Sequence, residues 1–169
     1  MKEIKRLTLS AMFLALAFLM PFLTGQIPQI GSMLCPMHIP VLLCGFFCGP
    51  LWGGIIGIFA PLLRSLTLGM PPLFPTAFAM AFELATYGFI AGYVYNKLKK
   101  SKPNTYIALI CAMILGRIVW GLVMFACMGF NSAQFNFTTF IAGALTSAIP
   151  GILLQILIIP LLVNIIDKN

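Results

Sequence analysis

Three ionisable residues lie inside long apolar stretches of this 169-residue sequence: Arg64, Glu83 and Arg117. A carboxylate such as that of Glu83 accepts hydrogen bonds from hydroxyl and amide groups. A guanidinium binds a carboxylate or a phosphate through paired N–H groups. These three side chains therefore suit the recognition of a polar solute, and we expect Arg117 to be the partner of Glu83.

Aromatic and thioether side chains accompany two of these charges at helical spacing. Small-molecule sites usually combine such walls with a few polar anchors, so we expect Tyr87 and Trp120 to line the same site. The first stripe consists of Thr76, Met80, Glu83 and Tyr87, and the second of Met113, Arg117, Trp120 and Met124.

Other polar residues fall where apolar stretches begin or end. His38 begins the apolar stretch 38–68, and Asn131 and Gln134 lie in a polar connector, residues 129–137. We expect His38 to face the site and the two amides to close over a ligand.

Each candidate also has a structural interpretation that the sequence leaves open. Glu83 and Arg117 could form a buried ion pair that only fixes helix register. Arg64 could extend to the lipid headgroups, and His38 could cap its helix or face water.

Catalytic and metal-binding patterns are missing from the sequence. Three acidic residues and one histidine leave little for acid–base chemistry, and no phosphate-binding G-x-x-x-x-G-K-[ST] loop occurs. The five cysteines have no ligand partners at metal-binding spacing. We therefore expect no metal, no cofactor and no enzymatic activity; a small membrane enzyme using Glu83 is the alternative from another class.

Composition fixes the fold class. Hydrophobic residues make up 61% and charged residues 8% of the sequence, which is typical of an all-α integral membrane protein. The net charge of +7 comes mostly from Lys and Arg near the start and from residues 97–102. This clustering follows the positive-inside rule, so we expect a multi-pass protein of the bacterial plasma membrane, in contact with lipid and not with nucleic acid.

Six membrane helices are expected in a single domain, residues 1–169, with both termini in the cytoplasm. The first apolar run has no signal-peptide cleavage site after it, so we expect it to remain as a helix. The stretch 38–68 is too long for one span and contains Pro50, which favours two helices over one kinked helix. With two crossings in this stretch the lysines of 97–102 lie in the cytoplasm, whereas one crossing would place them outside. The expected helices are 7–23, 34–49, 51–68, 74–95, 106–130 and 138–166.

The whole sequence resembles the substrate-binding S components of energy-coupling-factor (ECF) vitamin transporters. The resemblance depends on the short helices, on the Ala11-x-x-x-Ala15 pair and on the run "HIPVLLCGFFCGPLWGGIIG". It implies high-affinity binding of a water-soluble vitamin or precursor, and association with a transmembrane coupling protein and two ATPase subunits. It also implies that Ala11 and Ala15 dock on the coupling protein and that the S component topples in the membrane during transport.

The nature of the solute is left open by the sequence. Two arginines against one glutamate would leave the site with a formal charge of about +1, which slightly favours an anionic vitamin such as pantothenate. The alternative is a neutral heterocycle such as riboflavin or pyridoxine, stacked on Tyr87 or Trp120. A structural subunit without any ligand is a further alternative.

Overall fold

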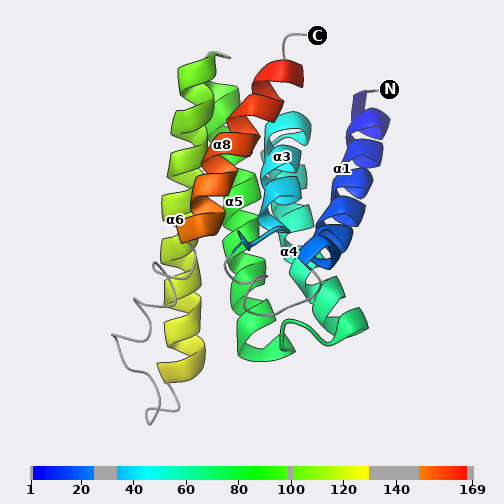
Figure 1. The fold of residues 1–169 in the computed structure, drawn as a ribbon, viewed down its shortest axis with the longest axis vertical. Helices are drawn as coiled ribbons and strands as arrows, with labels where there is room; N and C mark the ends of the chain where they lie inside the picture. Colours follow the sequence, from blue (N-terminus) through cyan, green and yellow to red (C-terminus); the bar gives the residue numbers. More distant parts are fainter. Residues whose placement is uncertain (1, 25–33, 99–100, 130–148, 167–169) are drawn as a thin grey trace.

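The computed structural model describes residues 2–24, 34–98, 101–129 and 149–166. Every element in these ranges is a helix, which confirms the all-α class (Figure 1). The α-helices are α1 (Lys2–Leu19), α3 (His38–Cys48), α4 (Pro50–Leu68), α5 (Phe78–Lys97), α6 (Lys102–Gly129) and α8 (Ile149–Ile166). A 3-10 turn, η1 (Met20–Thr24), continues α1, and a π turn, η2 (Leu73–Ala77), precedes α5.

Five helical segments are long and apolar enough to cross a membrane, and α3 is a shorter apolar helix. The 11 residues of α3 extend for about 16 Å, which is roughly half of the hydrocarbon thickness of a bilayer. The chain is therefore a multi-pass membrane protein. The exact number of crossings remains a prediction.

The predicted break at Pro50 is confirmed. The helix α3 ends at Cys48, and Gly49 takes φ 98° and ψ 175°, a backbone conformation that side chains disfavour. Pro50 then begins α4, where its missing N–H costs no helical hydrogen bond. The chain therefore reverses at this point instead of continuing as one kinked helix.

One end of the bundle collects several helix termini: the start of α1, the α3–α4 junction, the end of α5, the start of α6 and the end of α8 (Figure 1). Lys5, Arg6 and Lys97 belong to the helix ends that meet there. The two basic segments of the sequence, near the start of α1 and between α5 and α6, thus adjoin the same end of the bundle. Which side of the membrane this end faces is not tested by the structure and remains a prediction.

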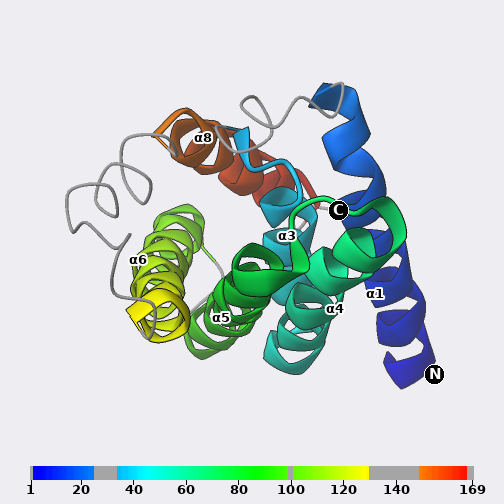
Figure 2. The same cartoon turned by 90° about the horizontal axis from the view of Figure 1, so that it is seen from below.

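Helix α5 lies between α4 and α6, and α1 packs on the other side of α4 (Figure 2). Glycines allow α3, α4 and α5 to approach closely. A Cβ added to Gly53 would lie 2.6 Å from the carbonyl oxygen of Gly88, and one added to Gly92 would lie 2.6 Å from that of Gly45. The spacing of small residues thus produces backbone-to-backbone packing, which fixes the position of α5 and of the charged residue it carries.

Candidate functional site

Glu83 occupies the second turn of α5 and is 1% exposed. Tyr87 follows it at i+4, on the same face of the helix, and is equally buried. The hydroxyl of Tyr87 donates a hydrogen bond to Oε1 of Glu83 at 3.0 Å. This local pair is a direct result of the helical stripe in the sequence.

The structure brings Arg117 of α6 to the same carboxylate. Its Nη1 lies 3.2 Å from Oε1 of Glu83, so the Arg117 guanidinium and the Tyr87 hydroxyl share one carboxylate oxygen. The Arg117 side chain is 20% exposed, and its Nε has no hydrogen-bond partner among the described residues. Arg117 therefore keeps a donor available beyond the ion pair.

His38, the first residue of α3, approaches the other oxygen of the carboxylate. Its Nε2 lies 3.9 Å from Oε2 of Glu83, too far for a hydrogen bond, and its ring is centred 5.3 Å from that of Tyr87. The residue is 2% exposed, and the helix has no side-chain cap. The interpretations in which His38 faces water or caps its helix are therefore wrong.

Cys35, a residue that the sequence did not single out, lies near Glu83 and Arg117. It lies in the turn before α3, with φ 46°, and its carbonyl accepts the backbone N–H of His38 at 3.0 Å. Burial raises the pKa of its thiol to about 11, although the nearby Arg117 opposes this shift. No residue pattern marks such a turn, since its position depends on how α3 packs against α5.

Two further residues shape the wall around Tyr87 and Arg117. Gly116 faces the Tyr87 ring so closely that an added Cβ would overlap two of the ring carbons, Cδ1 and Cε1. The guanidinium of Arg117 lies 6.0 Å from the centre of the Trp120 ring, at the outer limit for a cation–π contact. The structure thus brings Glu83, Arg117, Tyr87, His38 and Trp120 together. The name Glu83 cluster is used below for five residues: Glu83, Arg117, Tyr87, His38 and Cys35.

Arg64 does not join this cluster in any contact among the described residues. It lies near the end of α4, where its Nη1 donates to the carbonyl oxygen of Phe18 at 3.2 Å and its guanidinium lies 5.5 Å from the Phe22 ring centre. These neighbours belong to the end of α1 and to η1. Asn131 and Gln134, the other predicted ligand residues, lie outside the described residues.

Ala11 and Ala15 are exposed on α1, whereas Ser10, Phe13 and Ala17 are buried. The buried side of α1 faces α3 and α4. Ala11 and Ala15 therefore lie on the outer surface of the bundle.

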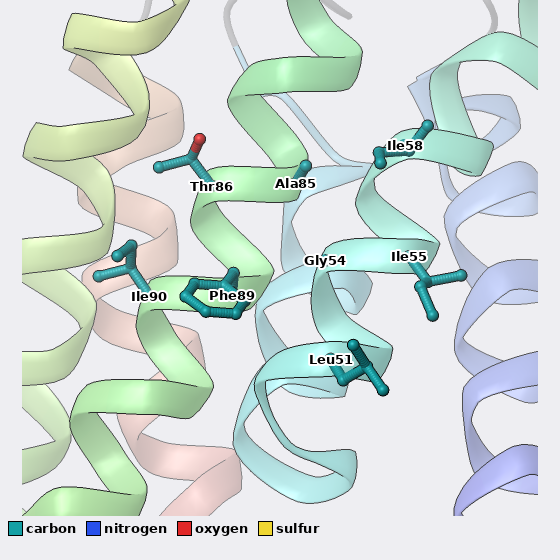
Figure 3. Close-up of a pocket in the computed structure, with 8 residues that line it drawn as sticks. All are labelled: Leu51, Gly54, Ile55, Ile58, Ala85, Thr86, Phe89 and Ile90. Carbon is teal, nitrogen blue, oxygen red and sulfur yellow. The ribbon is translucent and has the colours of Figure 1, made fainter.

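An open hollow of about 390 Å³ lies away from the Glu83 cluster, between the outer faces of α4 and α5 (Figure 3). Its one hydroxyl, that of Thr86, already donates to the carbonyl oxygen of Phe82 at 2.8 Å. An uncharged surface of this kind suits lipid chains better than a polar solute. It is lined by Leu51, Gly54, Ile55, Ile58, Ala85, Thr86, Phe89 and Ile90.

Metal chemistry has no support in the described ranges, since they contain no group of three or more potential metal ligands. The Glu83 cluster offers a carboxylate oxygen, a buried imidazole, a thiol and part of a guanidinium beside aromatic rings. Groups of these kinds are able to form hydrogen bonds with polar atoms of a small molecule.

Comparison with known proteins identifies the family. A search of curated proteins found no match. The family model described as "ECF transporter, substrate-specific component" matches residues 5–163, which is nearly the whole chain. Proteins of this kind bind a small-molecule substrate and associate with a module of ATPases and a transmembrane component, and they are not enzymes. The chain belongs to the family of ECF transporter substrate-specific components.

Proposed function

We propose that the Glu83 cluster is the solute-binding site of this S component, and that the solute is a water-soluble vitamin or vitamin precursor. The family supports the general role, and the proposal assigns it to particular side chains. Glu83 and Arg117 are the charged anchors, His38 and Cys35 are polar contacts, and Tyr87 and Trp120 are aromatic walls.

The observation that carries this proposal is that the buried ring of His38 lacks hydrogen-bond partners among the described residues. Neither of its ring nitrogens has a hydrogen-bond partner among the described residues, although the side chain is 98% buried. Buried polar atoms are nearly always paired, because an unpaired one costs about 1–3 kcal/mol. A purely structural ion pair would not require such a histidine beside it. A solute that donates or accepts a hydrogen bond at His38 would account for its position.

The charge of the cluster bears on the choice of solute. One glutamate and one arginine make it formally neutral, so its contacts alone suit a neutral heterocycle such as riboflavin or pyridoxine. An anionic vitamin such as pantothenate needs a cation beyond the cluster, which Arg64 would have to supply. Both kinds of solute remain candidates. Asn131 and Gln134 remain proposed as the residues that close over the solute.

We assign Ala11 and Ala15 to docking on the coupling protein. Small exposed residues four positions apart let another helix approach closely in lipid. The α1 segment also has the smallest buried share, 22%, among the five candidate spans of the described residues. A helix with so much free surface is suited to contact a partner.

The expected topology completes the proposal: one domain of six membrane helices in the bacterial plasma membrane, with both termini in the cytoplasm. Maleimide labelling of single cysteines placed at Glu3 and Thr67, in whole cells, tests it. Labelling by an impermeant maleimide is expected at position 67 only. Labelling at position 3 alone would reverse the topology.

Titration calorimetry of the purified protein with pantothenate, riboflavin and pyridoxine tests the assigned site. One of these, or a close precursor, is expected to bind to the wild type, and His38→Ala should reduce its affinity about tenfold or more, the value of one to two buried hydrogen bonds. Glu3→Gln is the matched control, because Glu3 lies in an exposed pair with Arg6. Equal affinities of the wild type and His38→Ala would contradict the assignment.

A further inference from the structure

Arg64 is a buried cation with no carboxylate partner among the described residues. The residue is 6% exposed, and its described partners are a carbonyl oxygen and an aromatic ring, both uncharged. Burying an unpaired charge is strongly unfavourable. The question is therefore which anion neutralises it.

The sequence contains three acidic residues, and the two that the structure describes both pair with other arginines. Glu3 pairs with Arg6 at 3.2 Å, in the first turns of α1. Glu83 pairs with Arg117. Asp167 lies outside the described residues; the helix before it, α8, ends at the opposite end of the bundle from the end of α4 (Figure 1). The described side-chain carboxylates, those of Glu3 and Glu83, therefore do not supply the missing negative charge.

The packing of α4 against α5 gives the position of Arg64 relative to the Glu83 cluster. These helices run in opposite directions, with Gly57 against Leu84 and Gly53 against Gly88. In this register Arg64 lies level with Ala77, which is six residues before Glu83. At 1.5 Å per residue, Arg64 is about 9 Å farther along the bundle, toward the end of α4.

Among the described residues, Arg64 has one hydrogen-bond acceptor, the carbonyl oxygen of Phe18. A guanidinium has five N–H donors, and the contact with the carbonyl oxygen of Phe18 uses Nη1. A planar group with free paired donors binds carboxylates and phosphates well. Since the residue is enclosed between α4 and the end of α1, its head does not extend into the lipid-facing surface as that of a snorkelling arginine does.

We propose that Arg64 is a separate anion-binding site that takes a carboxylate or phosphate group of the imported solute. This inference builds on the proposed function: the solute would contact the Glu83 cluster with a polar end and Arg64 with an anionic end, about 9 Å apart. Arg64 and the Glu83 cluster together would then prefer an elongated anionic vitamin to a neutral heterocycle. A lipid headgroup has the same phosphate chemistry, and the experiment below separates the two sources.

The experiment measures thermal unfolding of the full chain in a neutral detergent, with sodium acetate or phosphate compared with sodium chloride at equal ionic strength. We expect acetate and phosphate to raise the Tm of the wild type by about 2–5 °C, through weak binding to the folded state only. Arg64→Gln should lose this rise, Arg64→Lys should keep part of it, and Arg6→Gln, the exposed control, should keep all of it.

A rise of the same size in Arg64→Gln, or no rise in the wild type, overturns the inference. If Arg64→Gln does not fold, a reduced rise in Arg64→Lys supports the inference and an undiminished rise overturns it. Addition of phosphatidylglycerol, with phosphatidylcholine as the control, tests the lipid source. If phosphatidylglycerol alone abolishes the acetate effect, a headgroup occupies Arg64 and the solute assignment is wrong. No vitamin is used, so the outcome is independent of the His38→Ala test of the proposed function.

Discussion

Arg117 Nη1 lies 3.2 Å from Oε1 of Glu83, and the hydroxyl of Tyr87 donates to the same oxygen at 3.0 Å. His38 Nε2 lies 3.9 Å from the second oxygen, Oε2. The described contacts thus hold Oε1 more closely than Oε2. Under the proposed function, the solute would bind on the side of the carboxylate that faces His38.

Glu83→Gln removes the charge that neutralises Arg117. The variant should lose about 3–5 kcal/mol of stability, because a buried cation remains without its partner, and solute affinity should fall at least tenfold. Glu3→Gln breaks an exposed pair, with side chains 51% and 73% exposed, and should cost less than about 1 kcal/mol. Unfolding in detergent and calorimetry measure the two effects. Equal stability of the two variants would contradict a buried Glu83–Arg117 pair.

Gly88→Ala should disrupt the crossing of α4 and α5. The added Cβ would overlap backbone atoms of Gly53, which cannot move aside as a flexible side chain can. We expect a loss of about 1–3 kcal/mol or more, as for other overpacked sites. Gly54→Ala is the matched control, since its Cβ would meet Phe89 at an ordinary 3.6 Å. Unfolding curves that place both variants at the same midpoint would argue against close packing at Gly88.

Gly116→Ala should act on the site through Tyr87. The new methyl group would displace the Tyr87 ring and weaken its hydrogen bond to Glu83, so we expect about a tenfold loss of solute affinity. Tyr87→Phe removes the same hydrogen bond without displacing the ring and should cost less. If Gly116→Ala binds as tightly as the wild type, the Tyr87 ring does not contribute to the solute site.

Ala11→Trp or Ala15→Trp should abolish uptake by the complete transporter and leave solute affinity near normal, because a bulky side chain would keep the coupling protein away from α1. Leu157→Trp provides the control, since Leu157 is 71% exposed on α8. Uptake assays in cells and calorimetry of the isolated protein separate docking from binding. Normal uptake by both alanine variants would exclude docking at this face.

Cys35 gives a prediction about pH. Its thiol pKa is raised from 9.0 to about 11 by burial, so at pH 8 the reactive thiolate should be about a hundredfold rarer than for an unshifted thiol. In a variant that keeps only Cys35, alkylation by iodoacetamide should be slow at pH 8. Because the pKa is higher in the folded state, the stabilisation from the neutral thiol should decline as the pH rises from 9 toward 11. Rapid alkylation at pH 8, at the rate of an unfolded control, would contradict this burial.

The sequence predicted those parts of the structure that depend on local pattern. Pro50 after Gly49 marks the break between α3 and α4, and the i+4 spacing places Tyr87 beside Glu83. The meeting of Glu83 with Arg117 followed from equal depth in two neighbouring helices, since a charge in lipid requires a partner.

Other features depend on tertiary packing and have no local signal. Cys35 reaches Arg117 from a turn whose direction is set by the packing of α3. Arg64 was expected in the same site as Glu83, yet its described contacts are with Phe18 and Phe22, because α1 ends beside α4 at that level. Periodicity along one helix cannot show which neighbour a side chain will meet.

Mass spectrometry of the small molecules that copurify with the protein tests the central claim most directly. If the Glu83 cluster binds the imported solute, the wild type and Glu3→Gln should each carry one polar, water-soluble molecule in nearly equal amounts with protein, and Glu83→Gln and His38→Ala should carry little or none. Retention of the same molecule by folded Glu83→Gln and His38→Ala, at the wild-type level, would show that the solute binds elsewhere.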